Sequence, residues 1–187
     1  ASADVGGRFV VVEVGARNAP WAVRAMTAAR ALGRSRSWFA VLVEPMASHV
    51  QWIRHHFAMN GFGPEMYRVI SRPFGRRGVS LSETLRGLEH VDFLDIDAQQ
   101  GEADLVQSAA DAEALRRVRR VHIEGHRDAI SEAVIATLKL QGFNTLRNAS
   151  ARVYDVYNSS VVGRVQFRGA SIYAANRNAS NTMRGEC

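Results

Sequence analysis

The sequence has almost no cysteine and no long apolar segment. Its single cysteine, Cys187, is the last of 187 residues. This composition excludes an internal disulfide and a cysteine-based metal site, and it leads us to expect a reducing, cytoplasmic compartment. No apolar run approaches the roughly 20 residues of a membrane-spanning helix. We therefore expect neither a membrane span nor a membrane partner.

Positive charge, in contrast, is abundant. The chain has 24 Lys and Arg residues against 18 Asp and Glu, a net charge of +6. A basic surface favours anionic partners such as nucleic acid, acidic lipid headgroups or phosphorylated substrates. The hydrophobic share of 47% and the charged share of 22% are those of an ordinary globular protein. We expect a single domain over residues 1–187, with 176–187 as a frayed polar tail.

Strand-like and helix-like patterns alternate along most of the chain. Residues 9–12 are a β-branched and aromatic run, which is typical of a strand buried on both faces. From 19 to 32 the apolar residues recur instead at the helical period. Repeated βα units of this kind predict an α/β fold with a parallel sheet and right-handed crossovers. The other predicted strands are 38–43, 66–70, 91–96 and 119–124, and the other predicted helices lie around 50–57, 80–88, 102–116 and 128–141.

The C-terminal part has a different pattern. Residues 151–157 and 165–174 are strand-like, and no helical pattern separates them. Consecutive strands without a helix between them favour antiparallel pairing. We therefore predict an antiparallel pair at the edge of the sheet.

Acidic residues end the first two predicted strands, and ligands of open α/β sheets bind beyond such strand ends. The first strand runs into Glu13-x-Gly15. Glycine lets the backbone approach a ligand there, and the carboxylate can pair with the amino group of an amino-acid-like ligand. Glu44 directly follows the second strand. A carboxylate has two oxygens for the two ribose hydroxyls of an adenosine cofactor; the alternative is a solvated loop acid.

Two aspartates end the fourth predicted strand. Asp95 and Asp97 alternate around Ile96, so both point to the same side of the strand. Two close carboxylates suit acid–base chemistry or a hard cation. The alternative is that one of them caps the following helix.

The fifth predicted strand ends in His122-Ile123-Glu124-Gly125-His126. His122, Glu124 and His126 share one side by strand alternation. Histidine titrates near neutrality and can take a proton from a hydroxyl. A structural histidine is the alternative, and the segment lacks the helical spacing of the common zinc motif.

Four segments of the chain carry a more specific signal: Val12–Ala16, Val43–Pro45 with Asn60–Phe62, Val79–Leu85, and Asp92–Glu102. Together they resemble the FkbM family of S-adenosylmethionine-dependent methyltransferases, over most of the chain. The last segment is similar to the family's hydrophobic–Ile–Asp–x–Glu–Gly–x–Glu signature and is the most specific match.

The sequence departs from the family pattern in two places. The family usually has a second glycine four residues after the first, and Ala19 stands there, followed by Pro20. Asp-x-Glu-Gly is replaced by Asp97-Ala98-Gln99-Gln100-Gly101, with an extra residue and an amide in place of the acid.

The resemblance implies a Rossmann-like, seven-stranded class I methyltransferase sheet, mostly parallel with an antiparallel C-terminal strand. It also implies S-adenosylmethionine as cofactor and O-methylation of a small-molecule or sugar hydroxyl. We accordingly predict that the cofactor is bound by Glu13, Gly15, Ala16, Glu44, Pro45, Ser71 and Asp95. On the acceptor side we predict catalytic roles for Asp97, Glu124 and His126, with the base left open among them. We assign no residue to a metal.

Two other interpretations stay open at this point. A nicotinamide-dependent dehydrogenase would have a Gly-x-Gly-x-x-Gly turn, which the segment 15–20 lacks. A catalytically degenerate methyltransferase fold could instead bind an anionic partner, nucleic acid included, through the basic segments 72–77 and 116–120.

Overall fold

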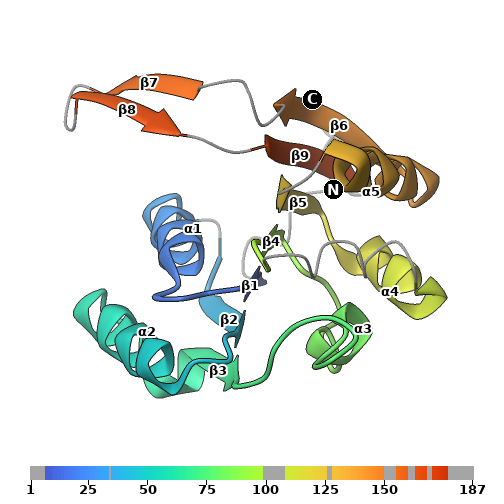
Figure 1. Ribbon diagram of the computed structural model, residues 1–187. Coiled ribbons are helices and arrows are strands. Elements are labelled where there is room, and N and C mark those ends of the chain that lie inside the picture. The colour runs from blue at the N-terminus through green and yellow to red at the C-terminus, as the bar shows by residue number, and fades with distance from the viewer. Residues whose placement is uncertain are drawn as a thin grey trace.

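The computed structural model describes residues 7–33, 35–98, 108–125, 128–149, 155–159, 163–167 and 170–176. These residues form a seven-stranded sheet of order β3-β2-β1-β4-β5-β9-β6 (Figure 1). The first five strands in chain order run parallel to one another, and β9 runs antiparallel to both β5 and β6. The strands are β1 (Arg8–Val14), β2 (Ser37–Val43), β3 (Tyr67–Ile70), β4 (Phe93–Ile96), β5 (Arg120–Gly125), β6 (Phe143–Ala149) and β9 (Ala170–Asn176). The predicted mostly parallel α/β sheet with an antiparallel C-terminal strand is confirmed.

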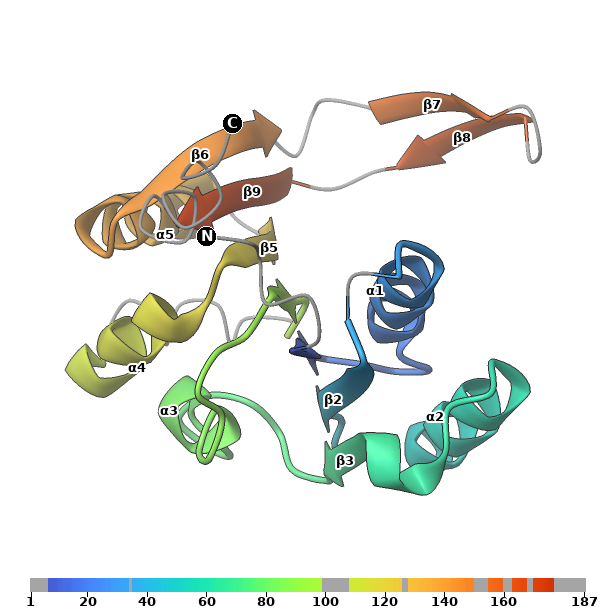
Figure 2. The same ribbon diagram turned by 180° about the vertical axis from the view of Figure 1, so that it is seen from behind.

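Helices cover both faces of the sheet, as the two opposite views show (Figures 1 and 2). The helices α1 and α2 lie on one face, and α3, α4 and α5 lie on the other. Their bounds are α1 (Pro20–Ala31), α2 (Ala47–Met59), α3 (Leu81–Thr84), α4 (Ala109–Ala114) and α5 (Asp128–Leu140), with short 3-10 helices at Pro64–Met66 and Leu115–Arg117. Within the described part of the chain, no helix has the length and apolar character needed to cross a membrane.

The central strand β1 alternates between two hydrophobic cores. Val10 and Val12 belong to the core beneath α3 and α5, whereas Val11 belongs to the core beneath α1 and α2. The buried apolar residues of α1 and α2, such as Met26 and Phe57, pack into the second of these cores. Because a strand alternates its side chains, the next residue on the α1 side after Val11 is Glu13. The fold therefore points a carboxylate at the beginning of α1.

The sequence-based elements agree with the structure up to α5, apart from their bounds. The predicted helix 19–32 is α1, and the strand 38–43 is β2. The predicted helix 102–116 is described only from residue 108, where it forms α4 and a 3-10 turn. Asn176, which was predicted to begin a frayed tail, is instead the buried end of β9, and 177–187 lie outside the described residues.

The predicted C-terminal strand pair is wrong in its partners. Residues Asp155–Ser159 (β7) pair with Gly163–Phe167 (β8) in a separate two-stranded sheet. This hairpin projects from the β9 edge toward the side of α1 (Figures 1 and 2). The strand that pairs with β9 at the edge of the large sheet is β6, which the sequence analysis missed. Its pattern is irregular because the register shifts between Thr145 and Arg147, and Leu146 is 68% exposed.

Candidate functional site

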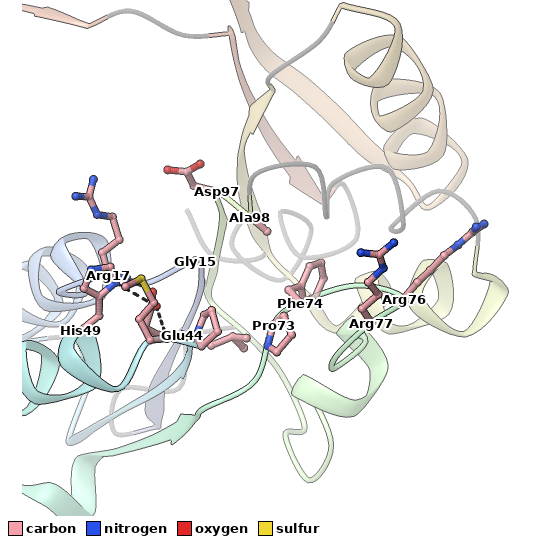
Figure 3. Close-up of a pocket in the computed structure, with 13 residues that line it drawn as sticks. Gly15, Arg17, Glu44, His49, Pro73, Phe74, Arg76, Arg77, Asp97 and Ala98 are labelled. Atoms are coloured by element: carbon pink, nitrogen blue, oxygen red, sulfur yellow. Dashed lines mark hydrogen bonds and ion pairs between the residues drawn. The ribbon is translucent and has the colours of Figure 1, made fainter.

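A cavity of about 770 Å³ opens at the carboxyl ends of the parallel strands (Figure 3). Its walls come from the turn after β1, the end of β2 with the start of α2, the loop after β3 and the end of β4. This is the edge at which open α/β sheets bind their ligands. The volume lies within the range of roughly 300–1,000 Å³ that is usual for small-molecule sites.

Gly15 joins three strands at the base of the cavity. The N–H groups of Gly15 and Ala16 both donate to the carbonyl oxygen of Val43 at the end of β2, at 3.0 and 3.1 Å. Gly15 has a φ of 77°, and a Cβ atom there would collide with the carbonyl oxygen of Asp97 after β4. Only glycine therefore fits this turn without moving β4.

The turn after Gly15 contains two further left-handed residues that are not glycine. Arg17 has a φ of 47° and Ala19 a φ of 55°. Each such residue costs roughly 1–2 kcal/mol relative to glycine because its Cβ approaches the following carbonyl oxygen. The position where the FkbM family usually has its second glycine is thus one where the backbone of this chain is left-handed.

Glu44 holds this turn against the start of α2. Its side chain is 3% exposed. Its Oε2 accepts a hydrogen bond from the N–H of Arg17 at 2.8 Å, and its Oε1 accepts from the N–H of Met46 at 2.9 Å and from Nδ1 of His49 at 3.1 Å. A second contact closes the turn, because Nδ1 of His56 donates to the carbonyl oxygen of Asn18 at 2.6 Å.

Glu13 lies beneath the same turn and caps α1. Its Oε2 accepts from the N–H of Ala22 at 2.7 Å, and its Oε1 accepts from the N–H of Trp21 at 3.4 Å. Burial, followed by the nearby carboxylate of Asp95, raises the pKa of Glu13 well above its ordinary value of 4.5, although the two N–H groups oppose this. Both oxygens thus serve the first turn of the helix.

The strand registers bring Glu13, Asp95, His122 and Tyr173 into one row across β1, β4, β5 and β9. Nδ1 of His122 lies 2.5 Å from Oδ1 of Asp95, and both side chains are buried. The ring of His122 stacks on Tyr173 with centroids 4.3 Å apart, and Trp21 lies on it at 5.4 Å. Burial raises the pKa of Asp95, while its hydrogen bond with His122 lowers it.

This pair fixes the orientation of an imidazole ring. Asp95 holds the ring of His122 through Nδ1, which turns Nε2 away from the carboxylate. Among the described residues Nε2 has no hydrogen-bond partner. Strand alternation predicted that His122 faces this side, and Asp95 was predicted to bind the cofactor. The register between β4 and β5 brings the two side chains together, and this register cannot be predicted from the sequence pattern of either strand.

The structure gathers part of the predicted site around the cavity. The predicted residues that line it are Gly15, Glu44, Pro45 and Asp97. Those that lie elsewhere are Glu13, Ala16 and Asp95, which are buried, Ser71, which is exposed, and Glu124, half-buried at the end of β5. His126 lies outside the described residues. Lining residues that the sequence analysis did not assign to the cofactor site include Arg17, His49, Arg76 and Arg77.

No set of side chains in the described part of the chain is suited to bind a metal ion. None of its His, Cys, Asp and Glu residues form a group of three or more that could hold a metal ion.

Comparisons with known proteins give the fold. No protein-family model matches the sequence, and no curated protein does. Among solved structures, a precorrin-6y methyltransferase from Geobacter metallireducens has a TM-score of 0.57 at 13% identity, over 90% of this chain and 80% of that chain. A precorrin 8W decarboxylase from Methanobacterium thermoautotrophicum has the same TM-score and identity, over 94% and 85%. The methyltransferase domain of METTL16 has a TM-score of 0.56 at 12% identity, over 90% and 60%.

At such identities the shared property is the architecture. The chain has the Rossmann-like fold of class I methyltransferases. Methyltransferases with this fold take S-adenosylmethionine as their methyl donor.

Replacing Arg17 by glycine should stabilise the protein. The side chain of Arg17 is exposed, so little packing is lost, and glycine removes the strain of the left-handed backbone. We expect the free energy of unfolding to rise by about 1 kcal/mol in urea titrations. Arg24→Gly is the matched control, because Arg24 is an exposed residue inside α1 where glycine should cost about 1 kcal/mol. Destabilisation by both variants would contradict the expectation.

Glu13→Gln should change how stability depends on pH. The raised pKa means that the folded chain binds more protons than the unfolded one between pH 4.5 and the folded pKa of Glu13. The wild-type free energy of unfolding therefore falls through this window as pH rises. Glutamine does not titrate, so the stability of the variant relative to wild type should rise with pH above 4.5 and then level off.

The measurement is urea unfolding of both proteins at several pH values. Glu65→Gln, which changes an exposed carboxylate, serves as the control for the loss of one negative charge. Parallel stability curves for Glu13→Gln and wild type would show that Glu13 does not titrate differently on folding.

Proposed function

We propose that this chain is an S-adenosylmethionine-dependent methyltransferase. The observation that supports this best is the cavity at the carboxyl ends of β1, β2 and β4, in which the buried carboxylate of Glu44 faces the glycine turn at Gly15. In a methyltransferase fold this is the edge where a nucleoside cofactor is held. The proposal therefore rests on the site and the fold together.

The donor set of the cavity fits such a cofactor. Glu44 offers two buried oxygens, which suit the two hydroxyls of a ribose. A carboxylate has about four lone-pair positions, and three are used by Arg17, Met46 and His49. One position on Oε2 is available at once, and a second requires a donor such as the His49 ring to move away.

Other residues in the walls of the cavity suit the remaining parts of S-adenosylmethionine. Gly15 and the backbone of Asp97 approach each other closely, so a ligand at this turn meets main-chain groups. Pro45 and Phe74 provide apolar surface for a flat ring. When bound, S-adenosylmethionine supplies a methyl group on a sulfonium sulfur, ready for displacement by an acceptor atom.

The residues of this chain would orient the acceptor and take its proton. Asp97 is half-buried and among the residues that line the cavity, which supports the sequence-based proposal that it takes a proton from the acceptor hydroxyl. Glu124 and His126 stay proposals from the sequence for the same task. Holding the acceptor atom in line with the methyl group of the cofactor is worth about 7–11 kcal/mol in favourable cases.

Two finer parts of the proposal come from the sequence resemblance alone. These are membership of the FkbM family and transfer to the oxygen of a small-molecule or sugar hydroxyl. The similar structures do not bear on the hydroxyl, because they are named for precorrins and for METTL16. The chemical class of the acceptor therefore depends on the residues that this chain places around the cavity.

A second candidate is a non-catalytic domain of the same fold that binds an anionic partner. Two observations favour it: Ala19 replaces a glycine at a left-handed position, and Glu44 already holds three donors. This candidate predicts nucleic-acid binding that weakens steeply with salt, without affinity for S-adenosylmethionine.

A thermal-shift screen separates the candidates. We expect S-adenosylmethionine and S-adenosylhomocysteine to raise the melting temperature in a concentration-dependent way, because a ligand that binds the folded state stabilises it by mass action. NAD should have no effect. A shift with NAD alone would favour a dehydrogenase, and no shift with any of the three would favour the non-catalytic domain.

Glu44→Gln should weaken S-adenosylhomocysteine binding by about 10- to 100-fold in calorimetric titrations. Glutamine keeps the size of the side chain but loses the charge that strengthens hydrogen bonds to the ribose. Glu89→Gln is the control, since Glu89 is exposed and does not line the cavity. Unchanged affinity in a variant whose unfolding remains cooperative would contradict the assignment of Glu44.

A further inference from the structure

The loop between β3 and α3 presents two adjacent arginines at the rim of the cavity. Its backbone is closed by hydrogen bonds from the N–H of Val79 to the oxygen of Pro73 at 2.8 Å and from the N–H of Gly75 to the oxygen of Val79 at 3.0 Å. The guanidinium of Arg72 donates to the oxygen of Gly78 at 2.8 Å. A Cβ on Gly78 would collide with the oxygen of Pro73, so the turn is as tight as glycine permits.

The base of this loop is anchored in the protein core. Phe74 packs against the core cluster beneath α3 and α5, and Gly75 is buried. Arg76 and Arg77 follow at the exposed tip, and both line the cavity (Figure 3). A closed and anchored turn therefore holds the backbone of the two exposed arginines in a fixed place. This lowers the conformational entropy that is lost when a ligand binds.

A third arginine lies on the other side of the cavity. Arg17 is exposed on the turn after β1, and its backbone is fixed by Glu44 (Figure 3). Within the described residues, neither the guanidinium of Arg17 nor that of Arg77 has a hydrogen-bond or ion-pair partner. The carboxylate of Glu44 is buried at the base of the cavity and engaged with three donors. The rim is therefore positively charged above a negatively charged base.

We infer that this rim, defined by Arg17, Arg76 and Arg77, binds the acceptor substrate through a phosphate or carboxylate group. The planar fork of arginine matches both groups, since it can donate two parallel hydrogen bonds. A neutral sugar would leave the guanidinium groups of Arg17 and Arg77 without a charged partner beside the cofactor. The inference rests on the proposed methyltransferase function and narrows its acceptor to small phosphorylated or carboxylated molecules.

The test uses two small anions that carry no other recognition element. Pyrophosphate and tricarballylate are titrated by calorimetry, at low ionic strength, into protein saturated with S-adenosylhomocysteine. We expect at least one of them to bind, and to bind more weakly as salt is added, because an exposed ion pair is screened. Tighter binding of pyrophosphate indicates a phosphorylated acceptor, and tighter binding of tricarballylate a carboxylated one.

Variants connect the binding to the rim. Arg77→Gln should weaken binding of the preferred anion by about tenfold, and Arg17→Gln should weaken it as well, because each removes a charge-assisted hydrogen bond. Arg54→Gln is the matched control: Arg54 is exposed on α2 and does not line the cavity. It should leave the affinity unchanged.

The outcomes separate this inference from the proposed function. If S-adenosylhomocysteine binds but neither anion does, or if the anion binds equally well to Arg77→Gln, the inference is overturned and the methyltransferase proposal stands. Binding of the anion only when S-adenosylhomocysteine is absent would also overturn it, because acceptor and cofactor must be bound together. Anion binding that depends on Arg77 in a protein without affinity for S-adenosylhomocysteine contradicts the methyltransferase proposal and leaves the rim as an anion site.

Discussion

The cavity keeps its shape because the buried carboxylate of Glu44 gathers three donors. The N–H of Arg17 fixes the turn after β1, while the N–H of Met46 and the ring of His49 fix the beginning of α2. Removing a carboxylate from water costs several kcal/mol unless hydrogen bonds compensate for the lost hydration, and these three donors do so. If the cavity holds a nucleoside cofactor, as proposed, the same oxygens would accept hydrogen bonds from its ribose. Binding would then exchange partners on Glu44, and both the turn and α2 would take part.

Glu13 shows that the acid at the end of β1 has a different task from the acid at the end of β2. The helix α1 begins with Pro20, and its N-cap residue, Ala19, has no side chain that could accept a hydrogen bond. The first N–H groups of a helix need acceptors, and Glu13 supplies them from the strand below. The carboxylate also stabilises the helix through its dipole. Glu13 therefore supports the turn after β1 from beneath, whereas Glu44 lines the cavity.

The sequence predicted most of the sheet because buried parallel strands are continuous apolar runs that are easily recognised. The edge strand β6 was missed for the opposite reason: only one of its faces meets α5, and its register shift leaves Leu146 exposed. The position of Gly15 and Glu44 at the carboxyl ends of β1 and β2 was predictable, because each directly follows an apolar strand pattern. The pairing of Asp95 with His122 was not, because it depends on the register between β4 and β5. The arginine rim likewise depends on how the loop after β3 folds back toward β1, a relation that no local pattern contains.

The left-handed residues Arg17 and Ala19 connect the stability of the turn to the chemistry of the cavity. Each costs roughly 1–2 kcal/mol, so the turn keeps this conformation only because surrounding contacts hold it. Those contacts are the hydrogen bond from Arg17 to Glu44, that from His56 to the Asn18 carbonyl, and the cap that Glu13 provides. If a ribose displaces the N–H of Arg17 from Glu44, part of the strain is released in the same step. The loss of that hydrogen bond is then offset, and a turn with little glycine can still accept the cofactor.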